Sequence, residues 1–266
     1  FFLYLSHFAV HSPYEAKPEL VEKFKPKAGV GGHNNPTYAA MIFSVDQSVG
    51  RVLAVLEELK LADNTVVVFS SDNGGVGGYA REGIVNAGHV TDNLPLRSGK
   101  GSLYEGGTRV PLIVRWPGVT PPGSTCDVPT IHVDLYPTFL QIAGAAAPAG
   151  YLLDGESLVP LLRQSGTLRR EAIYHHFPGY LGAGQNTWRT TPVGVITVGD
   201  WKLMEFFEDG RLELYNLRDD LSEQVNLAGK NPEKTKELHE KLVAWRASVR
   251  APMPTPHTPD TTLPPK

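Results

Sequence analysis

Residues 65–75, TVVVFSSDNGG, join a run of β-branched and aromatic residues to a polar turn rich in glycine. Within the run 65–69, apolar and polar side chains do not alternate, which is typical of a strand buried on both faces. In α/β sheets, ligands bind beyond the carboxyl ends of the strands. The stretch therefore predicts a central strand whose following turn, Ser70 to Gly75, lies at a functional edge of the sheet.

The segments around this strand alternate between strand and helix signals. The apolar run 1–6 predicts a buried strand. Proline at a first helical position and apolar residues at helical spacing predict a long helix over 36–59. A further short strand is expected at 110–114, and Asp134 could cap a helix over 135–143. This alternation favours an α/β layer with a mostly parallel sheet.

After about residue 166 the pattern changes to short strands separated by turn residues. Strands are expected at 171–177, 193–198, 201–207 and 211–217, and one amphipathic helix at 232–249. Six prolines in the last sixteen residues favour an extended tail. The predicted domains are an α/β core over 1–165, an α+β subdomain over 166–250 and a Pro-rich tail over 251–266.

The overall composition is ordinary for a globular protein, with 41% apolar and 20% charged residues. A net charge of -3 gives no electrostatic reason to expect nucleic-acid binding. No uninterrupted apolar run predicts a membrane span. Residues 1–6 lack the basic region of a signal peptide and are interpreted as a core strand. A chain that opens inside a strand is expected to continue upstream.

Asp72 and Asn73 are the candidate metal ligands. A carboxylate and an amide oxygen are hard donors suited to Ca²⁺ or Mg²⁺. Glycines after them would let the backbone bend so that neighbouring side chains converge. The alternative is an ordinary turn, and the tripeptide Asp-Asn-Gly alone favours that alternative.

Lys100 lies between two glycines in residues 97–107, RSGKGSLYEGG. A lysine so flanked can bring its ammonium close to an anion with little steric obstruction. The segment is not a phosphate-binding P-loop, because Leu94 stands where the first glycine of that motif should be. Taken alone, a flexible loop with a solvated lysine is the preferred interpretation.

His7 and His11 follow the first predicted strand. Histidine titrates near neutrality and can protonate a leaving oxygen. A single histidine is more often structural, and these two flank an apolar dipeptide, so they need not face the same way. His11 is nearer the loop and is the better catalytic candidate.

Together these stretches resemble the second half of type I, formylglycine-dependent sulfatases. The resemblance is carried by FFLYLSHFAVHSPY, TVVVFSSDNGG, LRSGKGSLYEGGTRVPLIVRWPG and DVPTIHVDLYPTFLQIAG. It extends over nearly all of residues 1–250. It implies an alkaline-phosphatase-like α/β core, present here as its C-terminal part, with a smaller C-terminal antiparallel sheet plus helix subdomain.

The resemblance also implies roles for individual residues. Asp72 and Asn73 would bind the divalent metal, usually Ca²⁺ with Mg²⁺ possible, together with two upstream aspartates. Lys100 would contact the sulfate, and His11 would contact it or protonate the leaving alcohol. His176 lies in a segment that many carbohydrate sulfatases place near the pocket, and it could contact a sugar or its sulfate. A structural role for His176 is equally compatible with the sequence.

The family nucleophile is a formylglycine made from Cys or Ser in the pattern Cys/Ser-x-Pro/Ala-x-Arg. The one cysteine, Cys126, is followed by Asp-Val-Pro-Thr and does not fit. The chain is therefore expected to be inactive alone, with the N-terminal half of the same fold as its partner. The parent protein is expected to be a sulfuric ester hydrolase acting on a sulfated glycan, in the periplasm or outside the cell.

Two other functions remain open from the sequence. A phosphatase or phosphodiesterase of the same superfamily would commonly use two metals with several histidine ligands. A non-catalytic glycan-binding pseudoenzyme would keep the pocket without the nucleophile.

Overall fold

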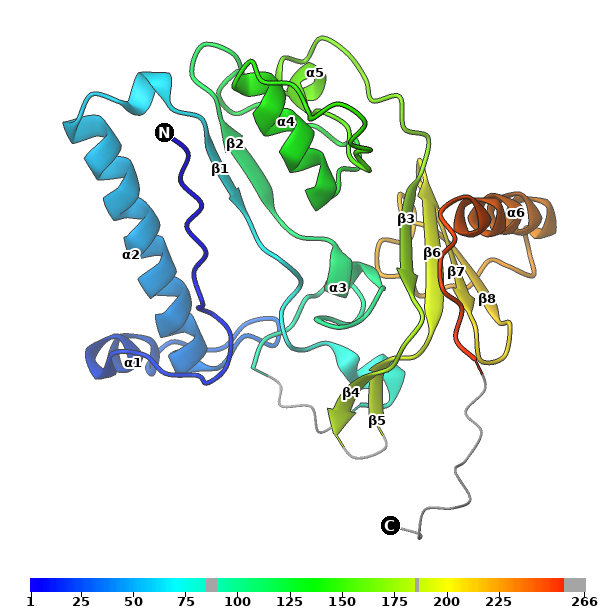
Figure 1. The fold of residues 1–266 in the computed structure, drawn as a ribbon. Helices are drawn as coiled ribbons and strands as arrows, with labels where there is room; N and C mark the ends of the chain where they lie inside the picture. The colour runs from blue at the N-terminus through cyan, green and yellow to red at the C-terminus, as the bar shows by residue number, and fades with distance from the viewer. Residues whose placement is uncertain (85–89, 185–186, 256–266) are drawn as a thin grey trace, which may run out of the picture. The chain divides into compact units, whose positions relative to one another are not determined.

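A computed structural model describes residues 1–84, 90–184 and 187–255 of the chain (Figure 1). The chain divides into two compact units, Phe1–Glu171 and Ala172–Lys266. Of the predicted Pro-rich tail, 251–255 has no regular secondary structure, and 256–266 lies outside the described residues.

The first unit combines helices with one pair of strands. Its elements are α1 Pro18–Phe24, α2 Pro36–Glu58, η1 Ala62–Asn64, β1 Val67–Ser70, η2 Tyr79–Glu82, α3 Glu105–Thr108, β2 Leu112–Arg115, η3 His132–Asp134, α4 Leu135–Ile142 and α5 Val159–Leu162. The predicted helix at 36–59 and the predicted strands at 65–69 and 110–114 are confirmed to within about two residues.

Helix α2 begins as its sequence predicts. The Asn35 side chain accepts a hydrogen bond from the Tyr38 N–H at 3.0 Å, and Pro36 occupies the first turn, where no backbone donor is needed.

By length and composition α2 is also apolar enough to cross a membrane, contrary to the expectation of no such segment. A mostly buried core helix would meet the same criterion, but only 17% of the apolar window of α2 is buried, and Asp46 and Arg51 interrupt the apolar residues of α2.

The strand arrangement of the first unit differs from the prediction in two ways. β1 and β2 pair antiparallel, with Val67 opposite Arg115, because the connection 71–111 returns the chain to the same end of the sheet. Residues 1–6 form no strand, and Phe1 and Tyr4 are 88% and 81% exposed. An apolar run indicates a preference for burial, but it does not identify the segment that must lie beside it.

The second unit is a four-stranded antiparallel sheet with one helix. Its sheet has the order β3-β6-β7-β8, and a separate hairpin is formed by β4 and β5. The elements are β3 Ile173–Phe177, β4 Leu181–Gly184, β5 Thr187–Thr190, β6 Val193–Val198, β7 Trp201–Phe206, β8 Leu212–Asn216 and α6 Pro232–Ser248. The four predicted strands and the helix are confirmed. The sequence did not predict the hairpin, because β4 is glycine-rich and shows no apolar alternation.

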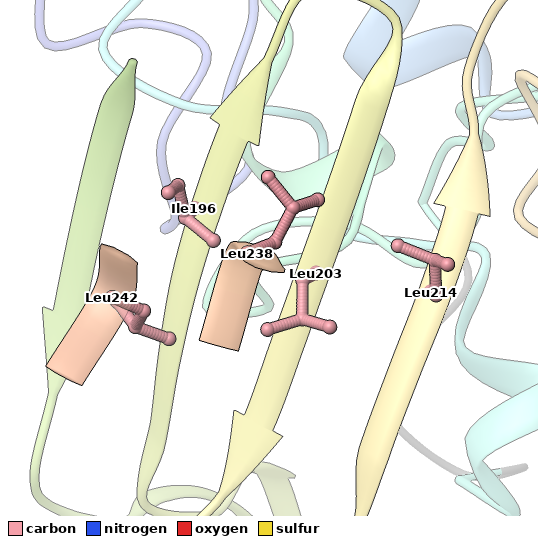
Figure 2. Packing of buried hydrophobic residues seen from close by; sticks show 5 residues of the cluster. All are labelled: Ile196, Leu203, Leu214, Leu238 and Leu242. Carbon is pink, nitrogen blue, oxygen red and sulfur yellow. The ribbon is translucent and has the colours of Figure 1, made fainter. Parts of the chain in front are cut away.

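The core of the second unit lies between this sheet and α6 (Figure 2). Ile196, Leu203 and Leu214 point from three neighbouring strands toward Leu238 and Leu242 of the helix, and all five are fully buried. Burying each such side chain contributes about 1.5–3 kcal/mol. At the edge of this core the rings of Tyr174 and Trp245 stack 4.6 Å apart.

Candidate functional site

The Asp72-Asn73 turn directly follows β1 and is held by its own side chains. Ser71 Oγ donates to the Asn73 carbonyl at 3.0 Å, and Asn73 Nδ2 donates to the Gly74 carbonyl at 2.9 Å. With its nitrogen so engaged, Asn73 presents its Oδ1 as the available acceptor. Asp72 is exposed, and within the described residues its carboxylate has no hydrogen-bond or ion-pair partner. Two hard oxygen donors therefore lie on consecutive residues of this turn.

Residues 97–107, called the lysine loop because they carry Lys100, pack directly against this turn. The Lys100 N–H donates to the Gly75 carbonyl at 3.0 Å, and the Gly74 N–H donates to the Gly107 carbonyl at 3.1 Å. The Asn93 side chain accepts from the Gly75 N–H and donates to the Gly75 and Ser98 carbonyls, all within 3.1 Å. Two segments singled out separately in the sequence are thereby joined into one site.

Glycines allow this close approach of backbones. A Cβ on Gly74 would lie 1.7 Å from the Gly106 carbonyl oxygen, and one on Gly99 would lie 2.4 Å from the Gly75 oxygen. Both distances are far below van der Waals contact, so no other residue fits without displacing the backbone. The sequence predicts backbone bending at Gly74 and, at Gly99, unobstructed approach of Lys100 to an anion, and the structure adds close backbone contact at both.

Side-chain contacts of charged and aromatic residues also hold the lysine loop in place. The Arg97 guanidinium lies over the Tyr104 ring at 3.7 Å and bonds Glu82 at 2.7 Å. The hydroxyl of the buried Tyr79 donates to the Lys100 carbonyl at 2.8 Å. Within the described residues the Lys100 ammonium has no hydrogen bond or ion pair, so it remains available to an anion.

His11 is exposed, and its contacts are local. Its Nδ1 donates to the Ser12 carbonyl at 2.9 Å, and its ring lies 5.4 Å from that of Phe8. No hydrogen bond in the described part of the chain links it to Lys100 or Asp72. The nearby His7 bonds Ser48 of α2 at 2.9 Å.

His176 lies on β3 and packs within the second unit. Its Nε2 donates to the Pro252 carbonyl at 2.7 Å, and its ring lies near those of Phe207 and Trp245. Its Nδ1 is buried without a partner. These contacts describe how His176 packs within the second unit, and its predicted contact with a sugar or its sulfate stays a prediction.

Sequence reasoning missed one residue beside the metal turn. His132, in η3, places Nε2 2.9 Å from the Ser71 carbonyl and 3.3 Å from Ser70 Oγ. Ser70 Oγ in turn donates to the Pro111 carbonyl at 3.0 Å. The motif that carries His132 contributed to the family resemblance, but nothing in its spacing connects it with Asp72.

The residues present fit part of a calcium site. Calcium takes six to eight oxygen ligands, of which Asp72 and Asn73 would supply two. Across the described ranges, this turn included, no cluster of three or more His, Cys, Asp or Glu side chains is arranged to hold a metal. The donor chemistry matches the predicted ion, and further ligands are needed to complete its coordination.

Comparison with known proteins assigns the family. A model described as Sulfatase matches residues 1–145, and one described as N-sulphoglucosamine sulphohydrolase, C-terminal, matches residues 99–248. The first covers more than half of the chain. The chain therefore belongs to the sulfatase family.

Individual relatives agree with this assignment. A sulfatase of Formosa agariphila is 37% identical over 95% of the chain, and the steryl-sulfatase of Rattus norvegicus is 38% identical over 69%. The chain spans 47% and 30% of the lengths of those two proteins.

Solved structures share the fold. A protein in complex with its substrate, D-glucosamine-2-N,6-O-disulfate, is 30% identical with a TM-score of 0.66, over 82% of this chain and 41% of that one. A phosphonate monoester hydrolase of Agrobacterium radiobacter is 25% identical with a TM-score of 0.59, over 80% and 41%. These likenesses confirm the predicted alkaline-phosphatase-like fold class with its smaller sheet-and-helix subdomain.

Proposed function

We propose that this chain contributes the metal-binding turn and the sulfate-contacting lysine of a sulfuric ester hydrolase. The observation that carries the proposal is the hydrogen bond from the Lys100 N–H to the Gly75 carbonyl. It joins the lysine loop to the turn that presents Asp72 and Asn73. A lysine and two hard oxygen donors carried on joined backbone segments suit a sulfate ester held by a divalent metal.

Each residue has a distinct role in this proposal. The Asp72 carboxylate and Asn73 Oδ1 bind Ca²⁺, or Mg²⁺, which when bound would polarise the sulfuryl oxygens. The Lys100 ammonium contacts the sulfate and stabilises charge that develops on it during transfer. His11 contacts the sulfate or protonates the leaving alcohol oxygen.

The nucleophile would come from outside these 266 residues, since none of their cysteines or serines fits the formylglycine pattern. The remaining metal ligands would come from the same upstream part of the fold. We therefore expect no hydrolysis of an aryl sulfate by the 266-residue chain alone. Measurable turnover by the purified chain would contradict this expectation.

The decisive experiment measures sulfate release by the full-length protein that carries this chain. Replacing Asp72 or Lys100 by alanine should lower kcat/KM by about 100-fold or more, because the first change removes a metal ligand and the second removes a cation that stabilises the transition state. Lys230→Ala, at an exposed lysine of the second unit, serves as the matched control and should leave activity unchanged. Full activity in both site variants would refute the proposed roles.

A sulfated carbohydrate is the proposed substrate, and the periplasm or the outside of the cell is the proposed location. The structural relative bound to a glucosamine disulfate supports the carbohydrate, whereas the steryl-sulfatase relative points to a steroid sulfate. The full-length protein should show a higher kcat/KM on a glucosamine sulfate than on a steroid sulfate. The reverse preference would overturn the carbohydrate proposal and leave the sulfatase proposal standing.

Phosphonate monoester hydrolysis is the second candidate, favoured by the likeness to the Agrobacterium enzyme. Competition between a sulfate ester and a phosphonate or phosphate monoester separates the two activities. Preferential cleavage of the phosphorus ester would replace the proposed sulfatase activity. Glycan binding without turnover of either ester would indicate a pseudoenzyme.

A further inference from the structure

We propose that His132 is a positioning residue that sets the geometry of the Asp72-Asn73 metal turn. The inference rests on the proposed function, because it concerns the same metal site. It arises from one contact that links η3 to the end of β1, 61 residues apart in sequence.

The contact acts on the peptide bond that leads into Asp72. Ser71 contributes its carbonyl oxygen, which can only accept a hydrogen bond, so the His132 Nε2 must carry the proton. The Ser71 carbonyl belongs to the same planar peptide unit as the Asp72 N–H. Because His132 holds this oxygen at 2.9 Å, it also sets the orientation of the peptide plane that joins Ser71 to Asp72. The direction of the Asp72 side chain depends on that plane.

The turn is then held on both sides. Upstream, His132 binds the Ser71 carbonyl, and downstream the Gly74 N–H binds the Gly107 carbonyl. Between these two anchors lie Asp72 and Asn73. Losing the downstream anchor would disturb the lysine loop as well, whereas losing His132 would loosen only the upstream end.

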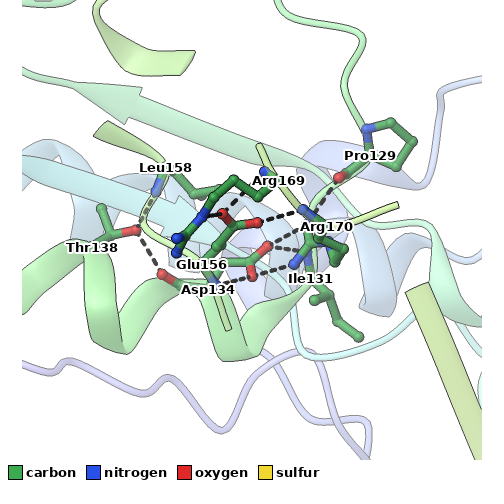
Figure 3. A network of polar contacts seen from close by, with 8 residues as sticks. All are labelled: Pro129, Ile131, Asp134, Thr138, Glu156, Leu158, Arg169 and Arg170. Carbon is green, nitrogen blue, oxygen red and sulfur yellow. Dashed lines mark hydrogen bonds and ion pairs between the residues drawn. The ribbon is translucent and has the colours of Figure 1, made fainter. Parts of the chain in front are cut away.

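A buried ion pair anchors the backbone on both sides of His132. Asp134 ends η3 and is fully buried, and its carboxylate binds the Arg170 guanidinium through both oxygens (Figure 3). The same carboxylate accepts the backbone N–H groups of Ile131 and Glu156 at 2.9 and 3.0 Å. The residues on both sides of His132 are thus anchored, which is the rigid support that a positioning side chain needs.

The test measures calcium affinity of the full-length protein by titration calorimetry, alongside its thermal midpoint without calcium. His132→Leu removes the donor, and we expect about tenfold weaker calcium binding, in the range seen when outer partners of metal sites are lost. His132→Gln can still donate from a similar distance and should bind within about twofold of wild type. His7→Gln replaces another exposed histidine bonded to a serine and should leave calcium affinity unchanged.

The outcomes separate this inference from the proposal beneath it. Weaker calcium binding in His132→Leu, rescued in His132→Gln at an equal thermal midpoint, supports the positioning role. Wild-type affinity in His132→Leu, while Asp72→Ala abolishes binding, overturns the inference alone. Equal losses in the Leu and Gln variants with a lowered thermal midpoint show a merely structural histidine. Absence of Asp72-dependent binding in wild type overturns the metal site and the inference together.

Discussion

The two units of the chain are stabilised in different ways. In the second unit, five aliphatic side chains from the sheet and α6 are fully buried against one another. In the first unit, apolar side chains of both strands remain exposed, 40% for Phe69 and 62% for Ile113. Buried apolar residues of this unit, such as Met41, Leu56 and Leu158, lie outside the two strands, and glycine contacts, backbone hydrogen bonds and the buried Asp134–Arg170 pair add to its order. The first unit thus leaves apolar side chains of its two-stranded sheet exposed, whereas the second unit buries apolar side chains of its sheet against α6.

This contrast agrees with the proposal that further sulfatase sequence covers the first unit. A pair of strands is marginal by itself, and an apolar run such as 65–69 is suited to burial on both faces. The second unit already buries its own apolar face. The three predictions that follow probe this difference, from the largest expected effect to the smallest.

Removing the cation of the buried Asp134–Arg170 pair should lower the stability of the first unit more than any other change predicted here. Arg170→Leu leaves the buried Asp134 carboxylate without its partner, and the free energy of unfolding should fall by about 3–5 kcal/mol. The measurement is urea unfolding followed at Trp116, which reports on this unit. The matched control is Arg169→Leu, whose side chain is 94% exposed, so its ion pair with Glu156 should contribute at most about 1 kcal/mol. Equal effects of the two variants would contradict the importance of the buried pair.

The apolar core should dominate the second unit. Leu203→Ala leaves a cavity under α6 and should cost about 2–5 kcal/mol, measured by urea unfolding at Trp201 and Trp245. The matched truncation in the first unit is Ile113→Ala, at a position 62% exposed, where about 0.5 kcal/mol or less is expected in this chain. In the full-length protein the cost of Ile113→Ala should rise if further sequence covers β2. If Ile113→Ala lowered the free energy of unfolding of the full-length protein by no more than about 0.5 kcal/mol, the proposal that further sequence covers β2 would be contradicted.

The same contrast explains how far the sequence alone could lead. Periodicity located α2, α6 and the strands of the second unit, because each of these elements carries its own local pattern. It failed for residues 1–6 and for the direction of β1 against β2, since both depend on which segments become neighbours. The motifs identified Asp72, Asn73 and Lys100 as candidates. The support that Asn93 gives to Gly75 and His132 gives to Ser71 is not predictable from spacing, because each acts on a main-chain group distant in sequence.

Acid should weaken both units through one glutamate in each. Burial raises the pKa of Glu156, but hydrogen bonds from the backbone of Arg170 and from Arg169 outweigh it and lower the pKa below 4.5. Burial likewise raises the pKa of Glu205, and Arg246 and His239 lower it further than burial raises it. Because both folded values lie below the unfolded value, the contribution to stability is present above about pH 4.5. It is lost as the pH falls through the folded pKa values.

The two glutamates can be separated by the tryptophan that reports on each unit. Glu156→Gln should flatten the acid-side loss of stability seen at Trp116 and leave the transition at Trp245 unchanged. Glu205→Gln should do the reverse, because its partners Arg246 and His239 belong to α6. Glu58→Gln, at an exposed position of α2, is the matched control. If either glutamine variant flattened both transitions equally, the two units would share one cooperative unfolding step, and their separate stabilisation would have to be abandoned.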